Sequence, residues 1–407
     1  MAAVQPPHAA AIDARAVGLF RPVRFPSPAR SPASGRGGDD PEAGGGNITY
    51  DYEQDAATRN QTTSAESPVP AWLIRRLGAD FFHEVVSSTL HGKQPKSDDD
   101  VRAFWSAVSQ LRQVELFQAS GKWVNGRMAT EAVGKHRRLT NLHLAAGNLC
   151  GSDLAPLAGL ANLETLTLYQ NPIGDDAAEH LGDFPKLKYA NLYLTNVGDA
   201  CLESIAANSN VESLQVNGTQ VTDRGLAHLA KLPKLRFLML GQTQVSDDGL
   251  RHLANLRRLE ALGLAGTKVT DQGLAHLAPL ENLQSLNVQQ TQISGIAFQE
   301  LQSLSRLENL VMADSPVTDE GALWASRLPG LKLVALGGSR VTDESLNQIA
   351  WPTSLESLLL NGTGLTNEGL MRLVDCPKLK IVYASRTKVT PEGIKRFQTA
   401  RPGVEVH

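Results

Sequence analysis

The chain has 407 residues, of which 20% are charged, and its formal net charge at pH 7 is −3. This balance creates no overall field of the kind that draws a protein onto nucleic acid or anionic lipid. The three cysteines, Cys150, Cys201 and Cys376, lie far apart in the sequence and form no metal-binding or redox pair. They are interpreted as reduced core residues.

Hydrophobic runs are short throughout the chain. None of them approaches the length of a membrane helix, and the N-terminus carries no apolar stretch long enough for a signal peptide. We therefore expect a cytoplasmic protein as the sequence is written. Membrane anchoring stays open as an alternative if the natural start lies upstream of Met1.

The first part of the chain differs in composition from the rest. Residues 1–46 are rich in alanine, proline, arginine, serine and glycine, with apolar residues at no regular spacing. Such a segment buries too little surface to offset the entropy lost on ordering, so it is predicted to be disordered.

Residues 47–110 are predicted to form an N-terminal capping region. A strand-like stretch begins at Ile48, and a short helix around 72–77 and a strand around 85–90 are expected after it. Ser97 is then predicted to cap a further helix. Apolar residues follow it at the spacing of one buried helical face, as Val101, Phe104, Trp105 and Val108.

A unit of 24 residues repeats through most of the remaining chain. The stretch GQTQVSDDGLRHLANL begins at Gly241, and AGTKVTDQGLAHLAPL follows it 24 residues later. A fixed period of this size indicates a solenoid, in which each unit packs on its neighbours. One polar position recurs without a slip, as Asn171, Thr195, Thr219, Thr243, Thr267, Thr291, Ser315, Ser339, Thr363 and Thr387. We expect this side chain to turn inward at the bend after each strand and to bind backbone groups there.

Each unit is also predicted to contain a short helix. Serine or threonine recurs at the expected N-cap, and Thr390 in this column precedes Pro391, which a first helical position tolerates. Aspartates such as Asp223 and Asp271 follow in the first turn, where a carboxylate complements the helix dipole. They lack the dense spacing of a calcium loop and are therefore interpreted as part of the helix caps.

The pattern L-x-x-L-x-L followed by a polar residue is that of leucine-rich repeats. Together with the segment GGNITYDYEQD and the closing VTPEGIKRFQTARPGVEVH, the repeats resemble bacterial leucine-rich repeat proteins of the planctomycete type over roughly residues 45–407. The resemblance implies ribonuclease-inhibitor-like repeats and supplies no catalytic residue. The predicted fold is α/β, a right-handed leucine-rich repeat solenoid (horseshoe) with a parallel concave sheet and short convex helices. Its predicted parts are the tail 1–46, the capping region 47–110, the repeat array 111–390 and a C-terminal cap 391–407.

No catalytic residue, cofactor or metal is predicted. The chain contains no G-x-S-x-G, P-loop, H-E-x-x-H or kinase motif set. Four histidines share one column of the helices, namely His180, His228, His252 and His276. Because helices pack about 8–10 Å apart, neighbouring rings are poorly placed to share one ion, and this row is interpreted as solvated.

The outward positions of the strands are the predicted binding surface. The residues predicted to contact a partner are Tyr169, Tyr189, Asn191, Tyr193, Gln215, Phe237 and Met239. Uncharged aromatic and amide side chains on neighbouring strands are typical of the centres of protein interfaces. Cross-strand packing among the rings alone is the alternative interpretation.

A charged column accompanies this surface at the rim. Its members alternate in sign from strand to strand, as Glu164, Lys188, Glu212, Arg236 and Glu260. Such exposed pairs are predicted to be minor stabilising contacts, each worth at most about 1 kcal/mol. Nucleic acid would require an unbroken basic stripe, so no nucleic-acid partner is expected.

The sequence therefore predicts a non-catalytic protein-binding module that holds a protein or peptide partner on the concave sheet face, with no membrane segment. A structural or scaffolding repeat protein is an alternative. A further alternative is the substrate-recognition arm of an F-box-type ubiquitin ligase, because PAWLIRRLGADFF superficially suggests an F-box start. The stretch that follows Pro70 is too short for a complete F-box.

Overall fold

The computed structural model of the protein describes residues 97–110 and 114–407. The predictions for the tail 1–46 and for the elements within 47–96 lie outside these residues. The segment that suggests an F-box start also lies outside them.

Thirteen strands within the described residues form one parallel sheet, and their order in the sheet follows the chain. From β2 onward, the residues that pair between neighbouring strands are 24 positions apart, as Leu142 and Leu166 are. The strands are β1 (Leu116–Ser120), β2 (Asn141–Ala145), β3 (Thr165–Thr167), β4 (Tyr189–Asn191), β5 (Ser213–Gln215), β6 (Phe237–Met239), β7 (Ala261–Gly263), β8 (Ser285–Asn287), β9 (Asn309–Val311), β10 (Leu333–Ala335), β11 (Ser357–Leu359), β12 (Ile381–Tyr383) and β13 (Glu405–Val406).

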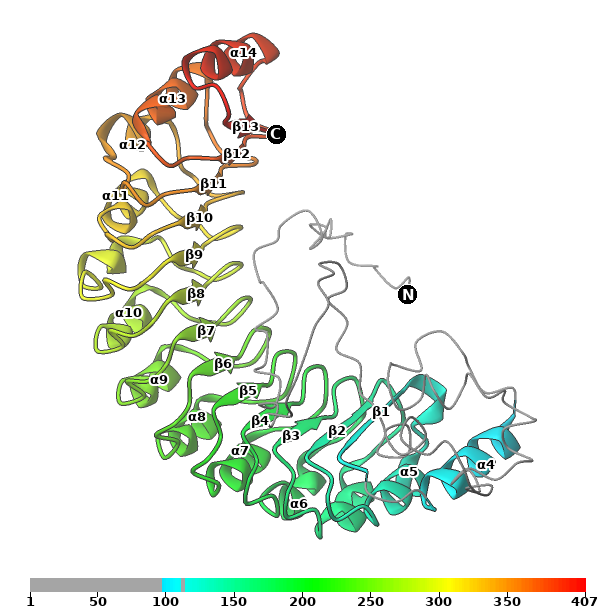
Figure 1. Cartoon of the computed structure of the whole chain (residues 1–407). Coiled ribbons are helices and arrows are strands. Elements are labelled where there is room, and N and C mark those ends of the chain that lie inside the picture. The colour runs from blue at the N-terminus through cyan, green and yellow to red at the C-terminus, as the bar shows by residue number, and fades with distance from the viewer. Residues whose placement is uncertain (1–96, 111–113) are drawn as a thin grey trace, which may run out of the picture. The chain divides into compact units, whose positions relative to one another are not determined.

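Short helices connect these strands on the other side of each coil (Figure 1). The α-helices are α4 (Asp98–Val108), α5 (Gly126–Val133), α6 (Ala178–Leu181), α7 (Asp199–Ala206), α8 (Asp223–Leu229), α9 (Asp247–Leu250), α10 (Asp271–Leu274), α11 (Asp319–Ser326), α12 (Asp343–Gln348), α13 (Asn367–Met371) and α14 (Pro391–Ala400). The 3₁₀ helices are η1 (Gly121–Trp123), η2 (Gly151–Leu157), η3 (Asp175–Ala177), η4 (Arg251–Leu253), η5 (Ala275–Leu277), η6 (Ile296–Gln299) and η7 (Arg372–Asp375). In Figure 1 the strands of the described coils line the inner side of the curve and the helices line the outer side. This arrangement confirms the predicted α/β solenoid.

Helix α4 covers the first coil, as its apolar face predicts. Ser97 caps the helix, because its side-chain oxygen accepts a hydrogen bond from the backbone N–H of Asp100 at 3.2 Å. Phe104 and Trp105 are fully buried, and the Trp105 indole donates to the carbonyl of Trp123 at 2.7 Å. The helix therefore closes the open end of the core with aromatic side chains.

One continuous core runs through all the coils. The middle residue of each three-residue strand points inward, and Leu166, Leu214 and Leu286 are completely buried. Burial of one such leucine contributes roughly 2 kcal/mol, so each coil gains its stability by covering the core of the next.

The recurring threonine column turns inward, as predicted. Thr219 and Thr243 are each 3% exposed. The Thr219 hydroxyl donates to the carbonyl of Val216 at 2.6 Å, and the Thr243 hydroxyl donates to the carbonyl of Leu240 at 2.6 Å. The hydroxyl thus donates a hydrogen bond to a carbonyl at the bend that receives none from the neighbouring strand.

The recurring aspartates join each coil to the next one. Asp223 accepts hydrogen bonds from the backbone N–H of Ser246 at 2.7 Å and from its hydroxyl at 2.6 Å. Asp247 accepts the same two bonds from Thr270 at 2.7 and 2.6 Å. We call this series of links between consecutive coils the aspartate ladder. The sequence places these carboxylates in the first helical turn, and the structure adds that they bind the N-cap of the following coil.

The ladder predicts how stability responds to acid. Burial alone would raise the pKa of Asp319, but hydrogen bonds from Thr342 and Ser345 hold that pKa below its ordinary value of 3.8. A carboxylate whose pKa is lower in the folded than in the unfolded state stabilises the fold above its ordinary pKa, and this contribution disappears as the pH falls through the lowered pKa. We expect the variant Asp319→Asn to lose less unfolding free energy than the wild type when the pH is lowered from 5 to 2.

Asparagine is a suitable replacement because the last rung of the ladder already uses it. Asn367 accepts from the backbone N–H of Thr390 at 2.9 Å and donates to its hydroxyl at 3.1 Å. Urea unfolding at several pH values measures the effect, and identical pH slopes for the variant and the wild type would contradict the assignment.

Candidate functional site

Five of the seven residues predicted to bind a partner lie on β4, β5 and β6, whereas Tyr169 and Tyr193 lie in the bends that follow β3 and β4. Asn191, Gln215 and Met239 are consecutive partners across β4, β5 and β6. Tyr189 and Phe237 stand on either side of Ser213 on β5. We refer to the set as the aromatic face; it consists of Tyr169, Tyr189, Asn191, Tyr193, Gln215, Phe237 and Met239.

Some of these rings pack against neighbouring side chains. Tyr169 meets His143 edge to face, with ring centroids 5.3 Å apart. The Arg236 guanidinium lies 5.1 Å from the centroid of the Phe237 ring. Ser213 is only 4% exposed on the strand between Tyr189 and Phe237. Cross-strand packing, the alternative interpretation of the aromatic side chains, therefore accounts for part of the surface.

The amide side chains keep hydrogen-bonding capacity for another molecule. Asn191 accepts a hydrogen bond from the backbone N–H of Tyr193 at 3.0 Å, which uses its oxygen. The Asn191 side-chain NH₂ and both ends of the Gln215 amide make no hydrogen bond to any residue in the described ranges. Both side chains are half-buried, so a docked backbone could bind them at little entropic cost.

The bend after β4 carries an exposed apolar pair, in which the predicted residue Tyr193 is joined by Leu194, which the sequence did not single out. Tyr193 is 37% exposed and Leu194 is 39% exposed. Leu194 also has a φ of +53°, in the left-handed region where the next coil has Gly218. Other coils share this conformation, with φ of +55° at Gln170 and +56° at Gln242, so it belongs to the bend of the repeat, and the exposed aliphatic side chain is what distinguishes Leu194. The sequence signal is an aliphatic residue in a column otherwise occupied mainly by glycine and glutamine.

The charged rim forms pairs, as the alternating signs predict. Lys188 donates to Glu164 at 2.9 Å, and Arg236 donates two hydrogen bonds to Glu260, at 2.7 and 2.8 Å. The hydrogen bond to Glu164 raises the pKa of the Lys188 ammonium group. Glu212 lies between these two pairs and makes no ion pair with any described residue.

The Glu212 carboxylate lies close to the aromatic face. Burial raises the pKa of the Tyr189 phenol, and the negative charge of Glu212 raises it further. The same carboxylate acts electrostatically on both Lys188 and Arg236. The rim next to the aromatic face therefore carries one carboxylate more than its cations.

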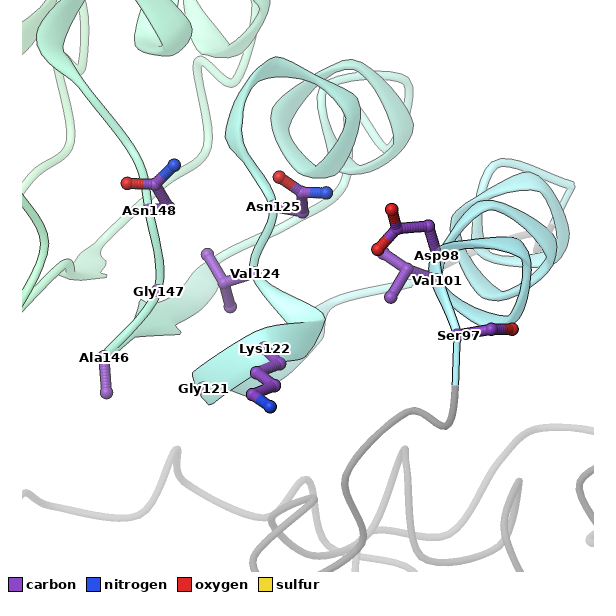
Figure 2. Close-up of a pocket in the computed structure, with 10 residues that line it drawn as sticks. All are labelled: Ser97, Asp98, Val101, Gly121, Lys122, Val124, Asn125, Ala146, Gly147 and Asn148. Atoms are coloured by element: carbon purple, nitrogen blue, oxygen red, sulfur yellow. The ribbon is translucent and has the colours of Figure 1, made fainter.

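A hollow of about 430 Å³ lies where α4 meets the first two coils (Figure 2). Val101 and Val124 form part of its lining and are almost fully buried. In Figure 2 the Lys122 side chain extends on one side of the connecting segment, whereas the amides of Asn125 and Asn148 lie on the other side. Because these polar groups do not converge, we assign the hollow to the seam between the capping helix and the array.

Neither the histidine row nor the cysteines form a compact cluster. No group of three or more histidine, cysteine, aspartate or glutamate side chains in the described residues is arranged to hold a metal ion. Cys201 and Cys376 are buried, and Cys150 is partly exposed; none of the three is in a disulfide. Burial raises the pKa of the Cys376 thiol to about 11, so this thiol stays protonated at neutral pH. Across the part of the chain that the structure covers, no helix combines the length and apolarity needed to span a bilayer.

Comparison with known proteins identifies the repeat and the fold. Residues 207–230 match the family model described as leucine-rich repeat. A search of curated proteins finds no match. Among solved structures, an internalin (inlF) from Listeria monocytogenes is 20% identical, with a TM-score of 0.47 and coverage of 76% of this chain and 93% of that one.

Two receptor structures are similar as well. A plant peptide hormone receptor, RGFR1 in complex with RGF2, is 15% identical with a TM-score of 0.49, covering 74% of this chain and 52% of that chain. A TDR receptor is 16% identical with a TM-score of 0.51, covering 78% of this chain and 60% of that one. At these identities the likeness concerns the fold. The match at residues 207–230, repeated in register by the coils on either side, identifies the described array as a leucine-rich repeat solenoid.

Proposed function

We propose that this protein is a non-catalytic binding module whose aromatic face holds a segment of a protein or peptide partner. Leucine-rich repeat proteins are typically binding modules, and solenoids of this kind commonly use their extended inner surface for binding. The two capping segments, GGNITYDYEQD and VTPEGIKRFQTARPGVEVH, additionally favour a bacterial protein with ribonuclease-inhibitor-like repeats.

The observation that carries the proposal is the composition of β4 to β6. Aromatic rings and amides occupy neighbouring strands there, and Tyr193 and Leu194 add exposed apolar area at the adjoining bend. Tyrosine is enriched among interface residues that dominate affinity because it combines apolar area with a polar end. The hydrogen-bonding groups of Asn191 and Gln215 that no described residue uses supply the polar contacts that a docked backbone requires.

Replacement of Tyr189, Tyr193 and Phe237 by alanine tests the proposal. Because an interface residue of this kind typically contributes more than 1 kcal/mol, we expect the triple variant to lose partner binding by more than about tenfold. Binding is measured by quantitative pull-down from the source cells with the full chain as bait.

The matched control changes the same kind of position farther along the sheet. Leu333 and Ile381 occupy, on β10 and β12, the column of Tyr189 and Phe237, so Leu333→Ala with Ile381→Ala removes similar apolar area outside the aromatic face. Thermal unfolding must show that both variants are folded. An unchanged set of partners for the folded triple variant counts against the aromatic face.

A further inference from the structure

The rim beside the aromatic face has a surplus carboxylate. From Glu164 to Glu260 the column contains three acids and two bases. Each base forms an ion pair with an acid at one end of this stretch, Glu164 or Glu260. Lys188 is hydrogen-bonded to Glu164, and Arg236 donates through Nε and Nη2 to the two carboxylate oxygens of Glu260. Glu212, in the middle, therefore has no cation of its own within the described residues.

The same column is fully paired farther along the sheet. Lys332 lies 2.7 Å from Glu308, and Lys380 lies 2.5 Å from Glu356. In both pairs one acid forms an ion pair with the base one coil later, and this part of the column contains no further charged residue. The unmatched carboxylate of Glu212 immediately precedes β5, which lies between the strands that carry Tyr189 and Phe237.

The surroundings of Glu212 favour a cation from another molecule. Glu212 immediately precedes Ser213, which lies between Tyr189 on β4 and Phe237 on β6. Aromatic rings attract cations through their faces, and an arginine side chain combines stacking on a ring with a two-pronged hydrogen bond to a carboxylate. A half-buried carboxylate is also less screened than a fully exposed one, so a pair formed there is stronger than an ordinary surface pair.

We propose that the partner segment on the aromatic face carries a basic side chain, arginine or lysine, that pairs with Glu212. This inference rests on the proposed function and specifies the chemistry of its partner. Glu212 supplies the charge selectivity, and the aromatic face supplies the apolar contact area. An acidic segment is disfavoured because the rim column from Glu164 to Glu260 already carries one more carboxylate than cations.

Selection from a displayed library of random twelve-residue peptides tests the inference. The full chain is used as bait in three forms, the wild type, Glu212→Gln and Glu212→Lys. We expect wild-type binders to be enriched at least threefold in arginine and lysine over the starting library. Glu212→Gln should abolish this enrichment, and Glu212→Lys should replace it by enrichment in aspartate and glutamate.

The control variant is Glu308→Gln, which neutralises an acid of the same rim column away from the aromatic face. It should select the same basic peptides as the wild type. For a selected basic peptide, we expect Glu212→Gln to raise the Kd at least tenfold at low salt, with a smaller factor at high salt.

The outcomes separate this inference from the proposed function. If the wild type selects no peptide, or if its peptides still bind the folded Tyr189, Tyr193 and Phe237 triple-alanine variant, the proposed function fails and the inference fails with it. Suppose instead that the triple variant abolishes binding. Only the inference is then overturned if the wild-type peptides are not enriched in basic residues, or if the bait Glu212→Lys still selects basic peptides.

Discussion

Replacing Asn171 by alanine should lower the free energy of unfolding by about 4 kcal/mol, because four backbone groups lose their partner together. The Asn171 oxygen accepts from the N–H groups of Gly147 and Leu149 at 3.1 and 3.2 Å. Its NH₂ group donates to the carbonyls of Leu144 and Leu168, both at 2.9 Å. The side chain is 2% exposed, so water has little access to replace these bonds.

The special role of Asn171 arises from the glycine one coil earlier. A Cβ on Gly147 would lie 2.4 Å from the Val124 Cβ and 2.5 Å from the Val124 carbonyl oxygen, so the capping region excludes a side chain there. In a later coil, the Thr195 hydroxyl donates to the carbonyl of Leu192 in the same coil, at 2.7 Å. Position 147 cannot do this for Leu144, and the longer side chain of Asn171 reaches back to do it instead.

Urea unfolding followed by circular dichroism measures the effect, with Thr219→Val as the control. That variant loses one hydrogen bond in the same column and should cost about 1 kcal/mol. Hydrogen exchange at the Gly147 and Leu149 amides should accelerate in Asn171→Ala. If the two variants are equally stable, water satisfies the exposed groups and the account of Asn171 is wrong.

Gly321→Ala should destabilise the protein by about 3 kcal/mol, at the upper end of what overpacking costs. A Cβ at this position would lie 2.0 Å from the carbonyl oxygen of Ser294 and 2.8 Å from the Cα of Gly295. Both atoms belong to the backbone, which cannot move aside as the end of a side chain can. The substitution would also displace the Ser294 carbonyl that accepts from the Thr318 N–H at 3.0 Å.

The close approach follows from a missing rung of the aspartate ladder. The ladder position between Asp271 and Asp319 is Gly295, which has a φ of +90° and no carboxylate. The Thr318 N–H therefore donates directly to a backbone carbonyl, and the backbones of these two coils come into contact at Gly321.

Gly174→Ala is the matched control for this prediction. The nearest atom to a Cβ there is Asp176 Oδ1 at 3.2 Å, and the next lies at 4.0 Å. We expect the control to change the unfolding free energy by less than about 0.5 kcal/mol. If the two substitutions shift the urea midpoint equally, the coils move apart easily enough to accommodate a Cβ at position 321, and the close contact there does not destabilise Gly321→Ala.

Much of the candidate site could be predicted because register follows from the repeat. Once one strand is located, a step of 24 residues places Tyr189 and Phe237 on either side of Ser213, and Asn191 beside Gln215. The exposed bend at Leu194 was not predicted, since its exposure and its positive φ are properties of the folded bend.

Pairing at the rim shows a second limit of the sequence. The alternating signs predict ion pairs, but they do not decide whether Lys188 binds Glu164 or Glu212, which lie at equal sequence distances from it. Side-chain packing in the folded sheet selects Glu164 and leaves Glu212 between two completed pairs. The surplus charge on which the partner's basic residue depends is therefore a feature of the tertiary structure.

The sequence by itself determined the period, the inward threonines, the parallel strands and the face on which each side chain lies. These features repeat in every coil, and each is specified by residues within one or two units. Only the tertiary structure decided where coils depart from the average, as at Asn171, Gly321 and Glu212. The physical reason is that hydrogen bonds, close contacts and ion pairs between coils depend on distances of a few tenths of an ångström, which a repeating pattern of residue types does not specify.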